Sequence, residues 1–262
     1  MSSFDAVSPQ SPAPATGGSL LFYQQPEALT AERHGKLKLA QDGDFGFARA
    51  TNSVAITSTE FAQAMRFYPI VFSGSKPYPV AILGLEQANL FVGADGHWRV
   101  GHYIPAYMRR YPFVFIAHPD GERFVLGIDR ACERLSDAEG VSNALPLFED
   151  GKPAAVTQEA LTFCSAFQSD HGITQTFTNA LVEQNLLVEN QAQAKLADGR
   201  QLNLAGFRVI DRAKFAALAD SVVADWHKKG WLALATFHLA SLDRFRNLLE
   251  SQGAAKPDGQ AA

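Results

Sequence analysis

Short apolar runs, rich in β-branched and aromatic residues and too brief for helices, recur through the first half of the chain. Such runs, bounded by turn residues, are typical of strands. Asp-Gly pairs at positions 95–96, 120–121 and 198–199 fall between paired runs, and Asp-Gly favours the tight turn of a β-hairpin. Because hairpins predominate over strand–helix–strand units, we expect an antiparallel sheet. Strands are predicted over residues 36–40, 54–56, 70–72, 80–83, 89–92, 97–100, 113–117 and 124–128.

The second half of the chain changes to helical spacing, with apolar residues recurring every three to four positions. The pair His171-Gly172 predicts a break within the first helical segment. A capping box of Thr57 and Glu60 starts an earlier helix, and Pro105 starts another. The predicted fold class is therefore α+β, with an antiparallel, hairpin-rich sheet in the N-terminal half and a helical C-terminal half. Helices are predicted over residues 60–67, 157–187, 213–227 and 231–249.

Both ends of the chain differ in composition from its middle. Residues 1–19 are rich in Ser, Pro, Ala and Gly, so burial of apolar surface cannot offset the entropy lost on ordering them. Residues 253–262 have the same character. We therefore expect two disordered tails around a single domain over residues 20–252, with a candidate sub-boundary in the turn-rich residues 129–156.

Composition and charge narrow the classes of function. The 262 residues are 47% hydrophobic and 19% charged, which is typical of a globular protein that needs neither a disulfide nor a metal to stay folded. The net charge of −4 and the pI of about 6.0 disfavour a nucleic-acid partner, because such proteins are normally basic. No apolar run approaches the ~20 residues that span a bilayer, so no transmembrane segment is predicted.

The N-terminus lacks the basic and apolar regions of a secretory signal. We therefore expect a cytoplasmic protein, and the alternative is export to the cell surface by a route that needs no N-terminal signal. Cys132 and Cys164 lie far apart and outside any metal-binding pattern, so both are expected to be reduced thiols.

Several segments, spread over about residues 20–250, carry a family resemblance through their order and spacing. The segments are 66–72 (RFYPIVF), 83–98 (LGLEQANLFVGADGHW), 103–113 (YIPAYMRRYPF), 147–153 (LFEDGKP), 198–211 (with LAGFRVID), and 230–242 (with GWL and HLASL). Together they resemble the SapC family, which is named from a bacterial paracrystalline surface layer and is distinct from a transporter permease of the same name. The resemblance implies the family's fold and at most an association with a surface layer, and it implies no reaction and no catalytic residues.

Segment 103–113 is the strongest candidate for recognition, because basic and aromatic side chains are interleaved in it. Tyr103 and Tyr107 offer ring faces, while Arg109 and Arg110 offer guanidinium groups that bind anions through paired hydrogen bonds. Together with Trp98, they predict a site for an anionic or sugar-like ligand, with at least one arginine facing a cleft. The alternative is that the rings belong to the core and that the arginines form ion pairs or cap backbone carbonyl groups within the fold.

A metal site is the main chemical alternative. His118 and Asp120, joined by one distal histidine, would supply the two-histidine, one-carboxylate set of non-haem iron enzymes. Candidates for the distal ligand are His171, His227 and His238. The simpler interpretation is that Asp120 begins a hairpin turn, and this interpretation is favoured because the H-x-D pattern is common by chance. No cofactor is therefore predicted, and no glycine-rich nucleotide motif is present.

Three functional hypotheses result. The leading one is a non-catalytic binding or accessory protein that recognises a small molecule or a protein partner near residues 103–113. The second is a non-haem iron-dependent enzyme that uses His118 and Asp120, and the third is a structural component of a surface layer. Metal analysis separates the first two hypotheses, and cell fractionation separates the third.

Overall fold

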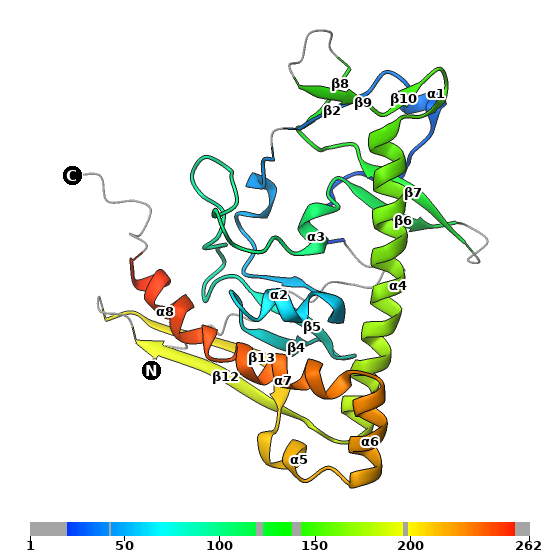
Figure 1. Ribbon diagram of the computed structural model, residues 1–262. Helices are drawn as coiled ribbons and strands as arrows, with labels where there is room; N and C mark the ends of the chain where they lie inside the picture. The colour runs from blue at the N-terminus through cyan, green and yellow to red at the C-terminus, as the bar shows by residue number, and fades with distance from the viewer. Residues whose placement is uncertain (1–19, 42, 119–122, 138–142, 196–198, 255–262) are drawn as a thin grey trace.

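The protein is described by a computed structural model that covers residues 20–41, 43–118, 123–137, 143–195 and 199–254 (Figure 1). The predicted tail over residues 1–19 lies outside the described residues, as do residues 255–262 of the second predicted tail. The same holds for Asp120, Gly121 and Asp198 of the predicted hairpin turns.

A five-stranded antiparallel sheet, in the order β12-β13-β4-β5-β3, forms the centre of the fold. Every residue of its three strands β3 to β5 is buried, as expected for short apolar runs covered on both faces of a sheet. In the hairpin of β4 and β5, Val71 lies opposite Val80, and Gly74 adopts a φ of +93° in the turn. The strands are β3 (Ser53–Ala55), β4 (Ile70–Ser73), β5 (Tyr78–Ile82), β12 (Leu187–Lys195) and β13 (Gln201–Ile210).

The described chain also contains three smaller antiparallel sheets. The hairpin predicted from residues 113–117 and 124–128 is confirmed as β6 (Phe113–Ala117) and β7 (Phe124–Asp129), and β7 also pairs with β1 (Pro26–Ala28). A second sheet has the order β8-β2-β9. The remaining strands are β2 (Lys38–Ala40), β8 (Leu135–Ser136), β9 (Ala144–Pro146) and the paired β10 (Phe148–Glu149) and β11 (Lys152–Pro153).

Helices dominate the C-terminal half, so the α+β class and its division between the two halves are as predicted. The long helix α4 runs along one side of the molecule, and α7 and α8 lie over the sheet beside β12 and β13 (Figure 1). The α-helices are α1 (Ala31–His34), α2 (Phe61–Ala64), α3 (Ala106–Arg109), α4 (Ala155–Glu183), α5 (Arg212–Ala216), α6 (Asp220–Lys228), α7 (Trp231–Ser241) and α8 (Arg244–Ala254), and two 3₁₀ turns are η1 (Gly46–Ala48) and η2 (Ser58–Glu60).

The prediction of a hairpin over residues 89–100 is wrong. Its two segments meet only at an isolated bridge between Val92 and Trp98, although the turn itself forms with Gly96 at a φ of +83°. The side chain of Asn89 accepts a hydrogen bond from the backbone N–H of Phe91 at 2.9 Å. Such a local side-chain bond competes with a strand ladder, so the segment is a loop.

The prediction of a helix break at His171-Gly172 is also wrong, because α4 continues through these two residues. Glycine costs a helix about 1 kcal/mol relative to alanine. Two nearby side chains, Phe177 and Leu181, are fully buried, and burying each contributes roughly 2 kcal/mol. The hydroxyl of Thr174 also accepts a hydrogen bond from Ser58 N at 2.7 Å, which ties this part of α4 to η2. Tertiary packing therefore outweighs the local preference.

Each of the two long C-terminal helices is divided in two, which corrects the predictions over 213–227 and 231–249. Residues 217–219 separate α5 from α6, with Ala219 in an extended conformation. Between α7 and α8, the hydroxyl of Ser241 donates to His238 O and accepts from Ile70 N of β4. The end of α7 is thus fixed to the sheet by a contact that no local pattern shows. None of the described helices is both long and apolar enough to cross a membrane.

Candidate functional site

The segment that carries the predicted site is anchored by a buried carboxylate. Helix α3 begins after Pro105, and the first N–H of the helix, on Ala106, donates to Glu60 Oε1 at 2.7 Å. The same oxygen accepts from the hydroxyl of Tyr103 at 2.9 Å. Glu60 Oε2 accepts from the N–H and hydroxyl of Thr57, which confirms the predicted capping box. The carboxylate of Glu60 therefore accepts hydrogen bonds at the start of both η2 and α3, and it orients Tyr103.

Burial raises the pKa of Glu60, and its hydrogen bonds with Ala106, Thr57 and Tyr103 oppose that rise. Desolvation also raises the pKa of Tyr103, and the charge of Glu60 adds to the effect. The phenol of Tyr103 therefore stays neutral near pH 7 and serves as a hydrogen-bond donor to the carboxylate rather than as a base.

Arg109 lies on the surface at the end of α3 and is held in place from two sides. Its Nε donates to Ile104 O at 3.1 Å, and its Nη2 donates to the hydroxyl of Tyr103 at 3.3 Å. The guanidinium carbon is 5.1 Å from the centre of the Phe163 ring on α4 and 5.8 Å from that of Tyr103. Arg109 pairs with no carboxylate in the described part of the chain, so its remaining N–H groups are open to solvent or a ligand.

Arg110 points in the other direction, into a cage of aromatic rings. Its guanidinium carbon lies 4.0 Å from the ring centre of Tyr107, 4.7 Å from that of Phe167 and 5.7 Å from that of Tyr23. Burial works to lower the pKa of Arg110, but Tyr23 and Tyr107 oppose it and the net shift is upward. The cation is therefore retained inside the fold by cation–π contacts.

The other two predicted site residues are buried. Trp98 is 7% exposed, and its Nε1 donates to the hydroxyl of Tyr68 at 3.3 Å. Tyr107 is 3% exposed beneath Arg110, and its hydroxyl donates to Leu21 O at 3.4 Å. The structure thus brings Tyr103 and Arg109 together near the surface, and it buries Tyr107 against Arg110. Trp98 is linked to the segment through Tyr68, whose hydroxyl donates to Tyr103 O.

Sequence reasoning did not include the α4 residues Phe163 and Phe167 in the site. They lie four residues apart on one face of α4, and each contacts one of the two adjacent arginines. The four-residue spacing is visible in the sequence, but it is equally typical of a core-facing stripe. Nothing local shows that this face of α4 meets α3.

An open hollow of about 590 Å³ lies along the first turns of α4, next to Phe163. Gln158 and the exposed carboxylate of Glu159 line it together with Thr162. The region around Arg109 therefore combines a cation, an aromatic ring and hydrogen-bond acceptors on two adjacent helices.

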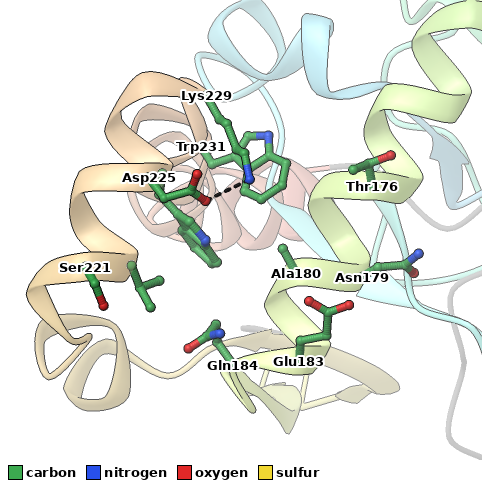
Figure 2. A pocket seen from close by; sticks show the side chains of 11 residues that line it. Thr176, Asn179, Ala180, Glu183, Gln184, Ser221, Asp225, Lys229 and Trp231 are labelled. Carbon is green, nitrogen blue, oxygen red and sulfur yellow. Dashed lines mark hydrogen bonds and ion pairs between the residues drawn. The ribbon is translucent and has the colours of Figure 1, made fainter.

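Figure 2 shows another hollow, of about 380 Å³, between α4, α6 and the start of α7. An ion pair lies along its α6 side, where Lys229 Nζ is 2.7 Å from Asp225 Oδ2. The same amino group lies 4.6 Å from the centre of the Trp231 ring. Lys229 therefore packs against the indole of Trp231, which lines this hollow together with Trp226.

The histidines of the metal alternative lie in different parts of the fold. His118 directly follows strand β6, and Asp120 lies outside the described residues. His171 stacks on Tyr78 with ring centres 4.7 Å apart, and His238 Nε2 accepts from Ile210 N at 3.0 Å. Within the described ranges, no group of three or more His, Cys, Asp or Glu residues is placed to hold a metal ion.

The sheets and helices described above define an α+β protein with its candidate recognition residues on a short helix. The SapC family model matches residues 29–248, most of the chain, and the protein belongs to the SapC family. This match confirms the resemblance seen in the sequence. Neither curated proteins nor solved structures give a match.

Proposed function

We propose that this SapC family protein is a non-catalytic binding protein that recognises an acidic, sugar-like ligand through Arg109. The observation that supports the proposal is the state of this side chain: an exposed guanidinium, without a carboxylate partner in the described chain, is held over two aromatic rings by hydrogen bonds to Tyr103 and Ile104. A surface arginine without such contacts would lose side-chain freedom on binding. Arg109 has already lost much of it in the folded protein.

The chemistry of the surroundings favours a ligand that carries both a carboxylate and hydroxyl groups. Arg109 supplies charge-assisted donors for the carboxylate, each worth roughly 1.5–3 kcal/mol. The ring of Phe163 supplies an apolar face, and Gln158 and Glu159 supply acceptors for hydroxyl groups along the adjacent hollow. An acidic sugar offers all three complementary features.

In this proposal the predicted site residues have two roles. Tyr103 and Arg109 face the ligand, while Trp98, Tyr107 and Arg110 hold the segment from inside the fold. The rigidity of α3 then depends on the bond from Ala106 N to Glu60 and on the aromatic cage around Arg110. Residues 103–113 act as a preformed surface rather than one that orders on binding.

Calorimetric titration with an oligogalacturonate, and with its uncharged methyl ester, tests the proposal. We expect the acid to bind and the ester to bind much more weakly. Arg109→Gln should weaken binding of the acid about ten- to a hundred-fold, and Phe163→Ala should also weaken it. The matched control is Arg130→Gln, since Arg130 is another exposed arginine and lies at the end of β7. Equal affinity in Arg109→Gln and Arg130→Gln would remove Arg109 from the site.

Elemental analysis of the purified protein separates this proposal from the iron-enzyme alternative. About one iron per chain, lost in His118→Ala, would favour the enzyme. Cell fractionation tests the surface-layer alternative in the same way, because a structural component would sediment with the cell surface.

A further inference from the structure

A small hollow on another part of the molecule gathers polar side chains from three separate segments, two of which contribute basic residues. It measures about 180 Å³. Arg66 follows α2, Arg99 and His102 belong to the loop before α3, and Asn247 and Ser251 come from α8. None of these residues belongs to the Arg109 region, so the hollow is a distinct candidate site.

The two arginines of this hollow are not neutralised within the described part of the chain. Arg66 is exposed, and its Nη1 donates to the amide oxygen of Gln63 at 3.3 Å, which leaves its other donors open. Arg99 is exposed and its side chain makes no hydrogen bond or ion pair with a described residue. The only carboxylate among the lining residues, Glu250, forms no ion pair with either of them. Both arginines therefore line the hollow without a carboxylate partner in the described chain, and Arg66 is also positioned by the Phe67 ring, whose centre lies 5.5 Å from its guanidinium carbon.

The ring of His102 is fixed at the edge of the same hollow. It packs against the rings of Phe67 and Phe91, with centres 5.0 Å and 5.4 Å apart. Its Nδ1 lies 3.1 Å from Val100 O, and because a carbonyl oxygen only accepts, the proton of the neutral ring is assigned to Nδ1. Nε2 is left without a hydrogen-bond partner in the described chain.

We propose that this hollow binds a phosphoryl group. Its lining combines the guanidinium groups of Arg66 and Arg99 with an amide and a hydroxyl from Asn247 and Ser251 on α8, and several such donors around one small hollow suit the oxygens of a phosphoryl group. The limited volume suits a single phosphoryl group. Glu250 reduces the net positive charge, so it acts against affinity.

Two sources could supply the phosphoryl group, a soluble phosphate ester or a lipid headgroup. Val100 lies between Arg99 and His102 in sequence and is 95% exposed, so the loop could also touch a membrane surface. The shared chemistry is a phosphoryl group bound by Arg66 and Arg99. The two sources are separated by using inorganic phosphate, glycerol 3-phosphate and vesicles containing phosphatidylglycerol as parallel probes.

Calorimetric titration of the full chain with inorganic phosphate, at fixed ionic strength set by chloride, tests the site. We expect Arg66→Gln and Arg99→Gln each to weaken phosphate binding about ten- to a hundred-fold, and Glu250→Gln to strengthen it several-fold. Arg130→Gln is the control, since Arg130 is exposed and lies outside this hollow, and it should bind phosphate as the wild type does. Melting temperatures of all variants show whether a loss of binding reflects a loss of folding.

The outcomes decide the proposal. Loss of binding in the two hollow variants together with a gain in Glu250→Gln supports it. Unchanged binding in Arg66→Gln and Arg99→Gln, an equal loss in Arg130→Gln, or weaker binding in Glu250→Gln would overturn it. Because Arg109→Gln leaves this hollow intact, failure here and failure of the acidic-sugar proposal are distinguishable. Vesicle binding that is sensitive to Arg66→Gln identifies a lipid headgroup as the source.

Discussion

Lowering the pH from 7 to 5 is expected to destabilise the protein through one buried histidine. His238 on α7 is fully buried, and its Nε2 accepts a hydrogen bond from Ile210 N of β13 at 3.0 Å. Its Nδ1 has no hydrogen-bond partner in the described chain. Burial lowers the pKa of His238 from 6.5 to about 3, and the nearby charge of Arg212 adds to the effect. The folded state therefore holds a neutral ring.

The sign and size of the effect follow from proton linkage. Because the folded-state pKa lies below the unfolded-state pKa, the unfolded chain binds more protons between these values, and the free energy of unfolding falls as the pH falls. At pH 5 the unfolded histidine is about 1.5 pH units below its pKa of 6.5, while the folded one is still neutral. At 1.36 kcal/mol per unit, the loss is about 2 kcal/mol. The loss continues toward pH 3.

Urea unfolding at pH 7 and pH 5 measures this contribution, with His238→Gln as the perturbation. Glutamine does not titrate, and its side-chain oxygen offers Ile210 N an acceptor. The exposed His227 on α6 supplies the control variant His227→Gln. We expect the wild type and His227→Gln to lose about 2 kcal/mol more between the two pH values than His238→Gln does. Equal losses in all three proteins would refute the reasoning.

Two further predictions concern the framework of the candidate site. Glu60→Ala leaves the buried N–H of Ala106 without its acceptor and removes the acceptor for Thr57, so urea unfolding should show a loss of at least about 3 kcal/mol, and a loss below about 1 kcal/mol would contradict the network. Arg110→Gln removes desolvated cation–π contacts worth about 2 kcal/mol and should lower the melting temperature by roughly 4–8 °C, whereas Arg109→Gln should leave it within about 2 °C of the wild type. Similar melting temperatures for the two arginine variants would count against the cage.

Local signals in the sequence predicted the parts of the fold that depend on neighbouring residues. The capping box of Thr57 and Glu60 needs only four consecutive positions, and the strands β4 and β5 need only short apolar runs bounded by turn residues. Long-range contacts decided much of the rest, whereas the loop over residues 89–100 follows from a local bond between Asn89 and Phe91. Ser241 divides the last two helices by bonding to Ile70, which is 171 residues away in the sequence.

The candidate site, too, could be predicted only in part from the sequence. Its segment was predicted from the interleaved aromatic and basic residues, and the short helix after Pro105 is present. Arg109 and Arg110 are adjacent, so helical spacing alone does not say which of them faces solvent. That difference is decided by α4, because Phe167 closes the cage around Arg110 and Phe163 lies under Arg109 at the surface.

The most direct test of the central claim is to map ligand contacts by nuclear magnetic resonance on the 28.4 kDa protein labelled with ¹⁵N. The Nε–H signal of Arg109 and the backbone amide signals of residues 103–109 and 158–166 are followed during titration with the oligogalacturonate. We predict that these signals shift in a saturable way and that the shifts disappear in Arg109→Gln. Saturable shifts confined to other regions, such as the hollow of Figure 2, with no change at Arg109 would contradict the proposed function.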